Sequence, residues 1–201
     1  MKGTHMLDAK GLDLLFHSAR TYNGFLDKPV TDEVLRSLYE ILKWAPTSMN
    51  SQPMRVVYLR SKESREKLAP ALSAANRDKT LAAPLTAIIA YDTRFYEHLP
   101  RMFPNNPNAM GIFLPAEKKA LAEITAFRNG TLQGAYFIIA ARAVGLDCGG
   151  MSGFDNAKVD AAFFPDGRLK SNFLVNIGYG DAAKLLPRNP RLSFAEVCSF
   201  L

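Results

Sequence analysis

The chain has 201 residues, of which 48% are hydrophobic and 22% are charged, a composition typical of a folded globular protein that excludes a disordered chain. Its formal net charge of +6 favours an anionic partner, but the basic residues are scattered, so we expect no nucleic-acid-binding surface. The two cysteines lie far apart and the three histidines have no ligand at metal-binding spacing, which predicts a cytoplasmic protein without a disulfide framework or a metal site.

The expected helices, in chain order and with their caps included, cover residues 9–19, 31–45, 61–72, 116–144 and 155–163, and the expected strands cover residues 56–59, 85–91 and 173–177. Few of the connections are simple crossovers, which favours an α+β fold with a central mixed or antiparallel sheet flanked by helices. The most apolar stretch, residues 135–146, is too short to span a membrane, so we expect no membrane partner.

Three segments stand apart from this pattern. Residues 1–6 look like a cloning remnant, which leaves residues 7–201 as a single domain. Residues 92–115 alternate prolines with aromatic side chains, a texture typical of an ordered lid. Residues 184–201 contain two prolines and end in an apolar stretch, which predicts an arm that packs on a partner subunit.

The segment between the helix ending at Ala45 and the next strand is uncharged and rich in hydrogen-bonding side chains. Thr47, Ser48, Asn50 and Gln52 stand there between two prolines, an arrangement suited to binding the edge of a planar polar molecule. The alternative is a capped turn, in which these side chains satisfy local backbone groups.

Polar residues also follow the first helix and the alanine-rich stretch near residue 75. Arg20 can grip a phosphate, and Thr21 and Tyr22 can add hydrogen bonds; the alternative is an arginine that caps a helix end. Asn76 can pair with an imide edge and Lys79 can stabilise an anion; the alternative is a solvated polar turn.

The glycine-rich stretch 145–155 lets a flat group lie directly on the backbone. A nucleophilic role for Ser152 or Cys148 in a hydrolase would require His98 nearby, and the G-x-S-x-G pattern is not completed. Residues 178–183 match G-x-G-x-x-A, but the chain that follows has no room for the helix and second strand of a dinucleotide site. Lys184, with two arginines farther along the tail, is instead expected to join Arg20 in a cationic phosphate clamp; the alternative is ordinary surface charge.

These segments resemble, in order and spacing, the nitroreductase family of flavin enzymes over essentially the whole chain. The matching pieces are Arg20, the Pro-Thr-Ser-Met-Asn-Ser-Gln-Pro run at 46–53, Asn76 with Lys79, residues 145–155 and the arginine-bearing tail. Residues 125–129, 150–155, 169–172 and 176–181 are similar to the RutE-like branch of malonic semialdehyde reductases.

The resemblance implies a homodimer that binds FMN at the subunit interface and exchanges C-terminal arms. It implies phosphate contacts from three arginines, backbone amides of Ser152 and Gly153 near flavin N5, and a polar segment that reaches the flavin of the partner subunit. The cofactor-binding residues so implied are Arg20, Thr21, Tyr22, Thr47, Ser48, Asn50, Gln52, Asn76, Lys79, Met151, Ser152, Gly153, Lys184, Arg188 and Arg191.

The implied activity is that of an FMN-dependent NAD(P)H oxidoreductase, with NADPH or NADH as co-substrate, that reduces malonic semialdehyde to 3-hydroxypropionate in pyrimidine catabolism. Reduction of nitroaromatics or quinones is the alternative within the family. One position departs from the pattern, since many members carry a cation beside flavin N1 where this chain has Gly24. Lys79 is the remaining candidate for that electrostatic role.

Overall fold

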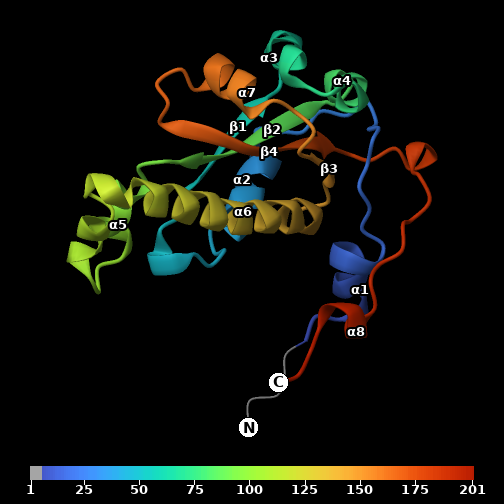
Figure 1. Cartoon of the computed structure of the whole chain (residues 1–201). Coiled ribbons are helices and arrows are strands. Elements are labelled where there is room, and N and C mark those ends of the chain that lie inside the picture. Colours follow the sequence, from blue (N-terminus) through green and yellow to red (C-terminus); the bar gives the residue numbers. More distant parts are fainter. Residues whose placement is uncertain (1–5) are drawn as a thin grey trace.

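The protein is described by a computed structural model that covers residues 6–201; residues 1–5, most of the expected cloning remnant, lie outside the described residues. At its centre, strands β1 (Met54–Leu59), β2 (Leu85–Asp92), β3 (Asp147–Met151) and β4 (Leu169–Gly178) form an antiparallel sheet in the order β1-β2-β4-β3 (Figure 1). The α+β prediction is confirmed, and of the two expected kinds of sheet the antiparallel one is present. Strand β3 was not predicted, because glycine is unfavourable in the interior of strands.

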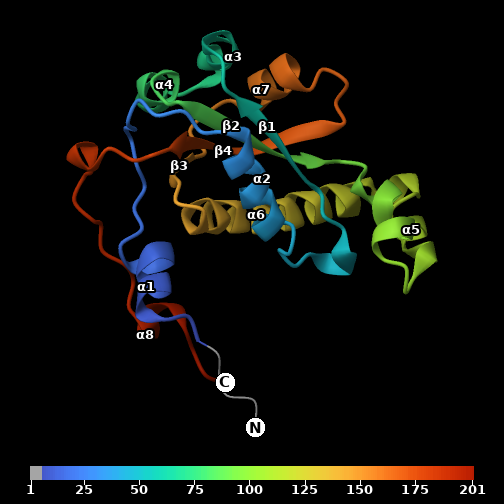
Figure 2. The same ribbon diagram turned by 180° about the vertical axis from the view of Figure 1, so that it is seen from behind.

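Helices cover both faces of the sheet. Helices α2 (Asp32–Leu42) and α6 (Lys119–Ala143) lie on one face, and α3 (Lys62–Leu68), α4 (Ala74–Leu81) and α7 (Asn156–Phe163) lie on the other (Figures 1 and 2). Every residue of β2 is buried because this central strand has helices above and below it.

The core follows the alternation of side chains along β2. Ile89 packs with Leu38 and Phe137 beneath α2 and α6, whereas Ile88 packs with Val159 beneath α7. Since successive side chains of a strand point to opposite faces, one apolar strand contributes to both layers of the core.

Most helix ends are set by capping residues that can be recognised in the sequence. The Thr31 hydroxyl accepts a hydrogen bond from the Val34 amide at 3.4 Å, and Asp155 caps α7 through the Lys158 amide at 3.1 Å. Gly145 ends the long helix with φ of +80°, a value that glycine adopts without strain.

Two local expectations need correction. The first helix, expected over residues 9–19, is a short α1 (Ala9–Leu12) followed by a π-helical turn, Asp13–His17. The polar residues 76–80, for which a solvated turn was the alternative, belong to helix α4, because the preceding 3-10 turn Ala69–Ala71 ends the alanine-rich stretch and Ser73 starts a new helix.

The segment 92–115 is compact and ordered. It contains α5 (Leu99–Met102) flanked by 3-10 turns, and Phe95, Leu99 and Phe113 form a separate apolar cluster with Met49. This cluster lies at the end of the molecule opposite α4 and β3 (Figures 1 and 2).

The two terminal segments run side by side away from the sheet, one past α1 and the other through α8 (Phe194–Val197) (Figures 1 and 2). Leu192, Phe194 and Phe200 of this tail are exposed. Within residues 6–201, no helix combines the length and the apolar character needed to cross a membrane.

Candidate functional site

The residues that follow the first helix lie along the outer edge of β3. The Tyr22 amide donates to the Cys148 carbonyl at 3.0 Å, and Thr21 forms a parallel bridge with Cys148. A Cβ at Gly149 would stand 2.4 Å from the Tyr22 carbonyl oxygen, so glycine is required where the two backbones run side by side. This contact brings Arg20, Thr21 and Tyr22 to the same edge of the sheet as residues 151–153.

The tail adds further positive charges to this edge. Arg20 donates to the Leu186 carbonyl, and Arg188 Nη2 donates to the carbonyls of His17 and Ala19 at 2.6 and 2.9 Å. Neither arginine forms an ion pair with a carboxylate in the part of the chain that the structure describes. Both guanidinium charges therefore remain available to an anion.

The other two tail residues of the predicted clamp are placed differently. The Lys184 side chain lies over Gly24, where a Cβ would be 2.3 Å from Lys184 Cδ, and its ammonium is 3.7 Å from Asp181 Oδ2. Among residues 6–201, Arg191 donates only to the carbonyls of Asn189 and Pro190, which belong to its own tail. Arg20 and Arg188 thus join the tail to the residues after the first helix, whereas Lys184 pairs with Asp181 and Arg191 contacts its own tail.

Helix α4 presents its polar side chains to the same edge. Asn76 Nδ2 donates to the Gly153 carbonyl at 2.9 Å, and Lys79 Nζ donates to Asn23 Oδ1 at 3.3 Å. The two residues are three positions apart on one helix, so both face the neighbouring segments. Lys79 is half-buried.

A residue missed by sequence reasoning holds this helix on the sheet. Asn176 of β4 is 1% exposed and donates to the Thr80 hydroxyl at 3.2 Å and to the Lys79 carbonyl at 3.4 Å, while its Oδ1 accepts from Thr86 at 2.8 Å. An amide in the middle of an apolar strand is the signal that could have found it, because a buried polar group needs a partner.

The remaining predicted site residues at this edge differ in how far they are buried. Met151 is buried in the core and accepts a hydrogen bond from Thr80, whereas Ser152 and Gly153 are exposed. The amides of Ser152 and Gly153 donate to no acceptor among residues 6–201, so two N–H groups are free beside the cationic side chains. Burial raises the pKa of the Tyr22 phenol, which remains a neutral hydrogen-bond donor.

The polar segment 47–52 lies in another part of the molecule, away from the β3 edge. It forms a tight turn beside α5, with the Ser48 amide donating to Asn129 Oδ1 at 2.8 Å and Asn50 Nδ2 donating to the Met102 carbonyl at 2.8 Å. The Thr47 hydroxyl accepts from the Gln52 amide at 3.2 Å. Asn50 Oδ1 accepts from Gln52 Nε2 at 2.9 Å. Some of these side chains therefore support a turn, and Ser48 and Asn50 are exposed.

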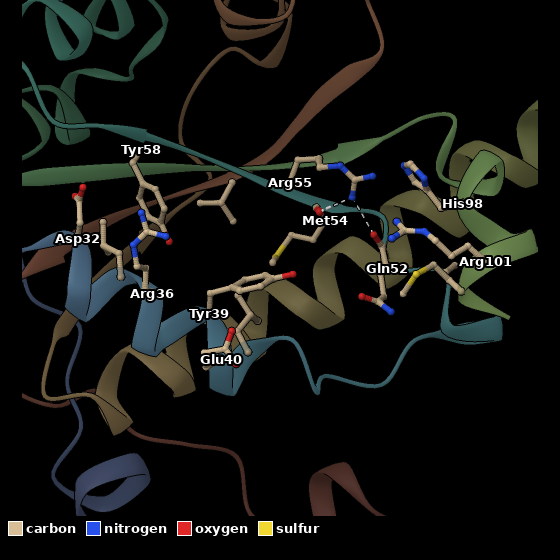
Figure 3. A pocket seen from close by; sticks show the side chains of 15 residues that line it. Asp32, Arg36, Tyr39, Glu40, Gln52, Met54, Arg55, Tyr58, His98 and Arg101 are labelled. Atoms are coloured by element: carbon tan, nitrogen blue, oxygen red, sulfur yellow. Dashed lines mark hydrogen bonds between the residues drawn. The ribbon is translucent and has the colours of Figure 1, made fainter.

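A groove of about 970 Å³ runs between α2 and β1 toward α5 (Figure 3). Tyr39 and Arg36 come from α2, Tyr58 from β1, and His98 and Arg101 from the segment 92–115. Of the predicted site residues only Gln52 lines this groove. The groove is thus distinct from the cationic edge at β3.

The structure gives no support to the hydrolase alternative. Burial raises the pKa of the Cys148 thiol to about 12, so this side chain carries no thiolate at neutral pH. His98 directly precedes α5 and Ser152 directly follows β3, and these two elements lie at opposite ends of the molecule (Figure 1). The stretch 178–183 leads into a 3-10 turn, Ala182–Lys184, as expected of a sequence that only resembles a dinucleotide site.

The sequence pattern of the Nitroreductase family matches residues 17–179 of this chain. The chain belongs to the nitroreductase family. A protein of Ralstonia pickettii with the provisional name NADH dehydrogenase/NAD(P)H nitroreductase HadB is 55% identical over 188 residues, which cover 94% of this chain and 96% of that protein. A relative from Stenotrophomonas maltophilia with the provisional name NADH dehydrogenase/NAD(P)H nitroreductase is 58% identical over 193 residues, which cover 96% of this chain and 97% of that protein.

Solved structures show the same family fold. A provisionally assigned nitroreductase from Exiguobacterium sibiricum, crystallised in complex with FMN, superposes with a TM-score of 0.83 at 17% identity and covers 98% of this chain and all of that one. At this identity the likeness establishes the nitroreductase fold.

Proposed function

We propose that the protein is an FMN-dependent NAD(P)H oxidoreductase whose cofactor lies at the β3 edge. The observation that carries this proposal is the convergence there of two arginines without carboxylate partners, the half-buried Lys79 and the free amides of Ser152 and Gly153. Arg20 and Arg188 fit a phosphate, while Asn76 and the free amides fit the polar rim of a flavin. The fold neighbour crystallised with FMN supports this choice of cofactor.

We further propose a homodimer in which residues 47–52 of one chain complete the site of the other. Within a single chain this turn lies beside α5, away from the β3 edge (Figures 1 and 2). Helix α6 exposes several large apolar side chains, and a second copy would cover them. These residues are Leu121, Ile124, Phe127, Leu132 and Tyr136.

When bound, FMN would supply the hydride-transfer chemistry between NADPH or NADH and a small acceptor. Arg20 and Arg188 would bind the phosphate, Asn76 would orient the flavin, and Lys79 would place a positive charge near it. As the acceptor we propose malonic semialdehyde: the aldehyde carbon gains the hydride, the oxygen gains a proton from water, and 3-hydroxypropionate forms. A nitroaromatic or quinone is the second candidate acceptor, favoured by the nitroreductase names of the relatives.

The proposal is tested with the purified protein. We expect a yellow protein that releases FMN on acid precipitation and oxidises NADPH or NADH in the presence of an acceptor. Comparison of kcat/KM for malonic semialdehyde, a nitroaromatic and a quinone identifies the acceptor. Release of FAD, or no flavin after incubation with FMN, would contradict the proposed cofactor.

Replacement of Lys79 with methionine is expected to lower the two-electron potential of bound FMN and leave its affinity largely unchanged. Lys79 is half-buried against Asn23, so its charge acts on the nearby cofactor with little screening, whereas the phosphate contacts come from other residues. For a two-electron couple, about 30 mV corresponds to 1.4 kcal/mol, so even a modest change is measurable by spectroelectrochemical titration. The exposed Lys118, changed to methionine, is the control. An unchanged potential in the Lys79 variant would assign the role to another cation or to none.

A further inference from the structure

The turn at residues 47–52 has an unusual backbone. Met49, Asn50 and Gln52 adopt positive φ values of 54°, 48° and 42°, although none of them is glycine. Such conformations are unfavourable for residues with a Cβ and persist only where the surroundings hold them. The Ser51 hydroxyl is also buried without a hydrogen-bond partner. The turn therefore needs support from outside its own six residues.

Part of this support comes from the side chain of Arg55. Its Nη1 donates to the Gln52 carbonyl at 3.0 Å and to the Met54 carbonyl at 2.8 Å. These bonds fix the end of the turn at the point where it enters β1. Asn129, which accepts from the Ser48 amide, holds the start of the turn in the same way.

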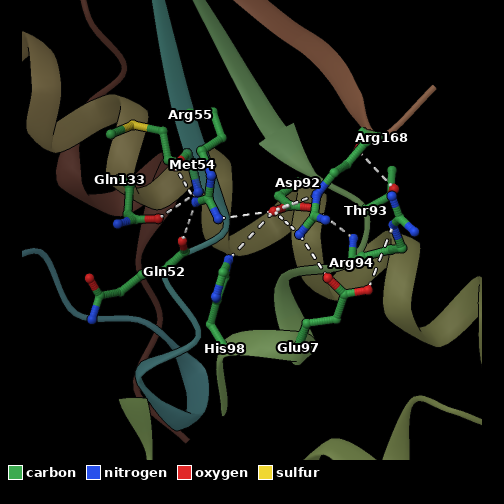
Figure 4. A network of polar contacts seen from close by, with 10 residues as sticks. All are labelled: Gln52, Met54, Arg55, Asp92, Thr93, Arg94, Glu97, His98, Gln133 and Arg168. Atoms are coloured by element: carbon green, nitrogen blue, oxygen red, sulfur yellow. Dashed lines mark hydrogen bonds and ion pairs between the residues drawn. The ribbon is translucent and has the colours of Figure 1, made fainter. Parts of the chain in front are cut away.

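The other side of the Arg55 guanidinium contacts Asp92, the last residue of β2 (Figure 4). The Asp92 side chain is 2% exposed, and its oxygens lie 2.9 Å from Arg55 Nη2, 3.1 Å from Arg168 Nη2 and 3.9 Å from His98 Nε2. The Arg94 amide donates to the same carboxylate at 2.9 Å. One buried carboxylate thus sets the orientation of two arginines.

The same network reaches the segment that packs against the turn. Arg168 also contacts Glu97 at 2.9 Å, in the 3-10 turn that precedes α5. Asn50 Nδ2 donates to the Met102 carbonyl at the end of α5. Asp92 is therefore linked to the turn by two routes. Arg55 connects it to the Gln52 carbonyl, and Arg168 with Glu97 connects it to the segment that leads into α5, on which Asn50 packs.

We propose that Asp92 is a positioning residue that, through Arg55, holds the turn 47–52 in the strained conformation in which Ser48 and Asn50 are exposed. This inference rests on the proposed function, in which those two residues meet the FMN of the partner subunit. Without the Asp92 charge, Arg55 and Arg168 would repel each other, and Arg55 would leave the Gln52 carbonyl.

The test is Asp92→Asn, a substitution of nearly the same size that removes the charge. Amide hydrogen exchange is followed by mass spectrometry on the full-length protein before and after addition of FMN. The Asn50 and Ser51 amides, which donate to the Thr47 and Ser48 carbonyls at 3.0 Å, are the reporters. We expect exchange in residues 47–53 to accelerate by about tenfold or more, and the Kd for FMN to rise by a similar factor.

Two further variants make the result specific. Arg55→Met leaves the Asp92–Arg168 pair in place and removes the hold on Gln52, so it should reproduce the faster exchange even where Asp92→Asn folds poorly. Glu123→Gln removes a carboxylate from the half-exposed ion pair with Lys170, 2.9 Å long, and should change neither readout.

The outcomes separate the proposals. Unchanged exchange at residues 47–53 in both Asp92→Asn and Arg55→Met would overturn the positioning role, as would faster exchange with unaltered FMN affinity. Absence of FMN binding by the unchanged protein would overturn the proposed function, and the exchange rates would still show whether Asp92 holds the turn.

Discussion

Removal of residues 190–201 is expected to convert a flavin-loaded dimer into a monomer that does not retain FMN. The tail carries Leu192, Phe194, Val197 and Phe200 with exposed side chains, and it extends away from the sheet beside the N-terminal segment (Figure 1). An apolar segment of this kind is stabilised by a second surface, which a partner subunit would provide. If the partner completes the flavin site, loss of the dimer also removes the contacts from residues 47–52.

Light scattering for mass and absorbance for flavin measure the two effects on the same sample. A milder variant, Phe194→Ser with Phe200→Ser, keeps the chain length and should make dimer formation depend on protein concentration. Arg188 is retained in both variants, so loss of flavin would not be due to loss of that phosphate contact. An intact, flavin-loaded dimer after truncation would contradict the arm as an interface element.

Replacement of Arg20 with alanine is expected to weaken FMN binding by about 10- to 150-fold, because a charge-assisted phosphate contact contributes about 1.5–3 kcal/mol. Arg20 contacts the Leu186 carbonyl and forms no ion pair among residues 6–201, so its charge is available to the phosphate. Titration of the flavin-free protein with FMN, followed by fluorescence, gives the Kd.

Because Arg20 also touches the tail, its variant could act through the dimer. Light scattering on the same protein separates the two effects, and Arg20→Lys, which keeps the charge without the two-pronged geometry, should give intermediate affinity. Arg60→Ala, which removes an exposed ion pair with Asp32, serves as the control and should leave the Kd unchanged. Equal affinities for Arg20→Ala and Arg60→Ala would exclude Arg20 from the phosphate site.

Much of the scaffold could be predicted from local physical rules. The cap at Thr31, the glycine at Gly145 and the unbroken apolar run of β2 each depend on neighbours in sequence, so helices and central strands are readable without the fold. The family could be predicted as well, since its short motifs recur at the right separations, and the match over residues 17–179 confirms it.

Other features exist only because distant segments meet. Strand β3 pairs with β4 despite its glycines, and Gly149 is required by the close approach of the Tyr22 backbone, more than a hundred positions earlier in the chain. Asn176 matters for the site because α4 lies over it, and Asp92 because Arg55 and Arg168 converge on it. Hydrophobic periodicity and capping involve residues that are close in the sequence, so they can be recognised without the fold. The pairing of buried polar groups depends instead on which elements the packed core brings together.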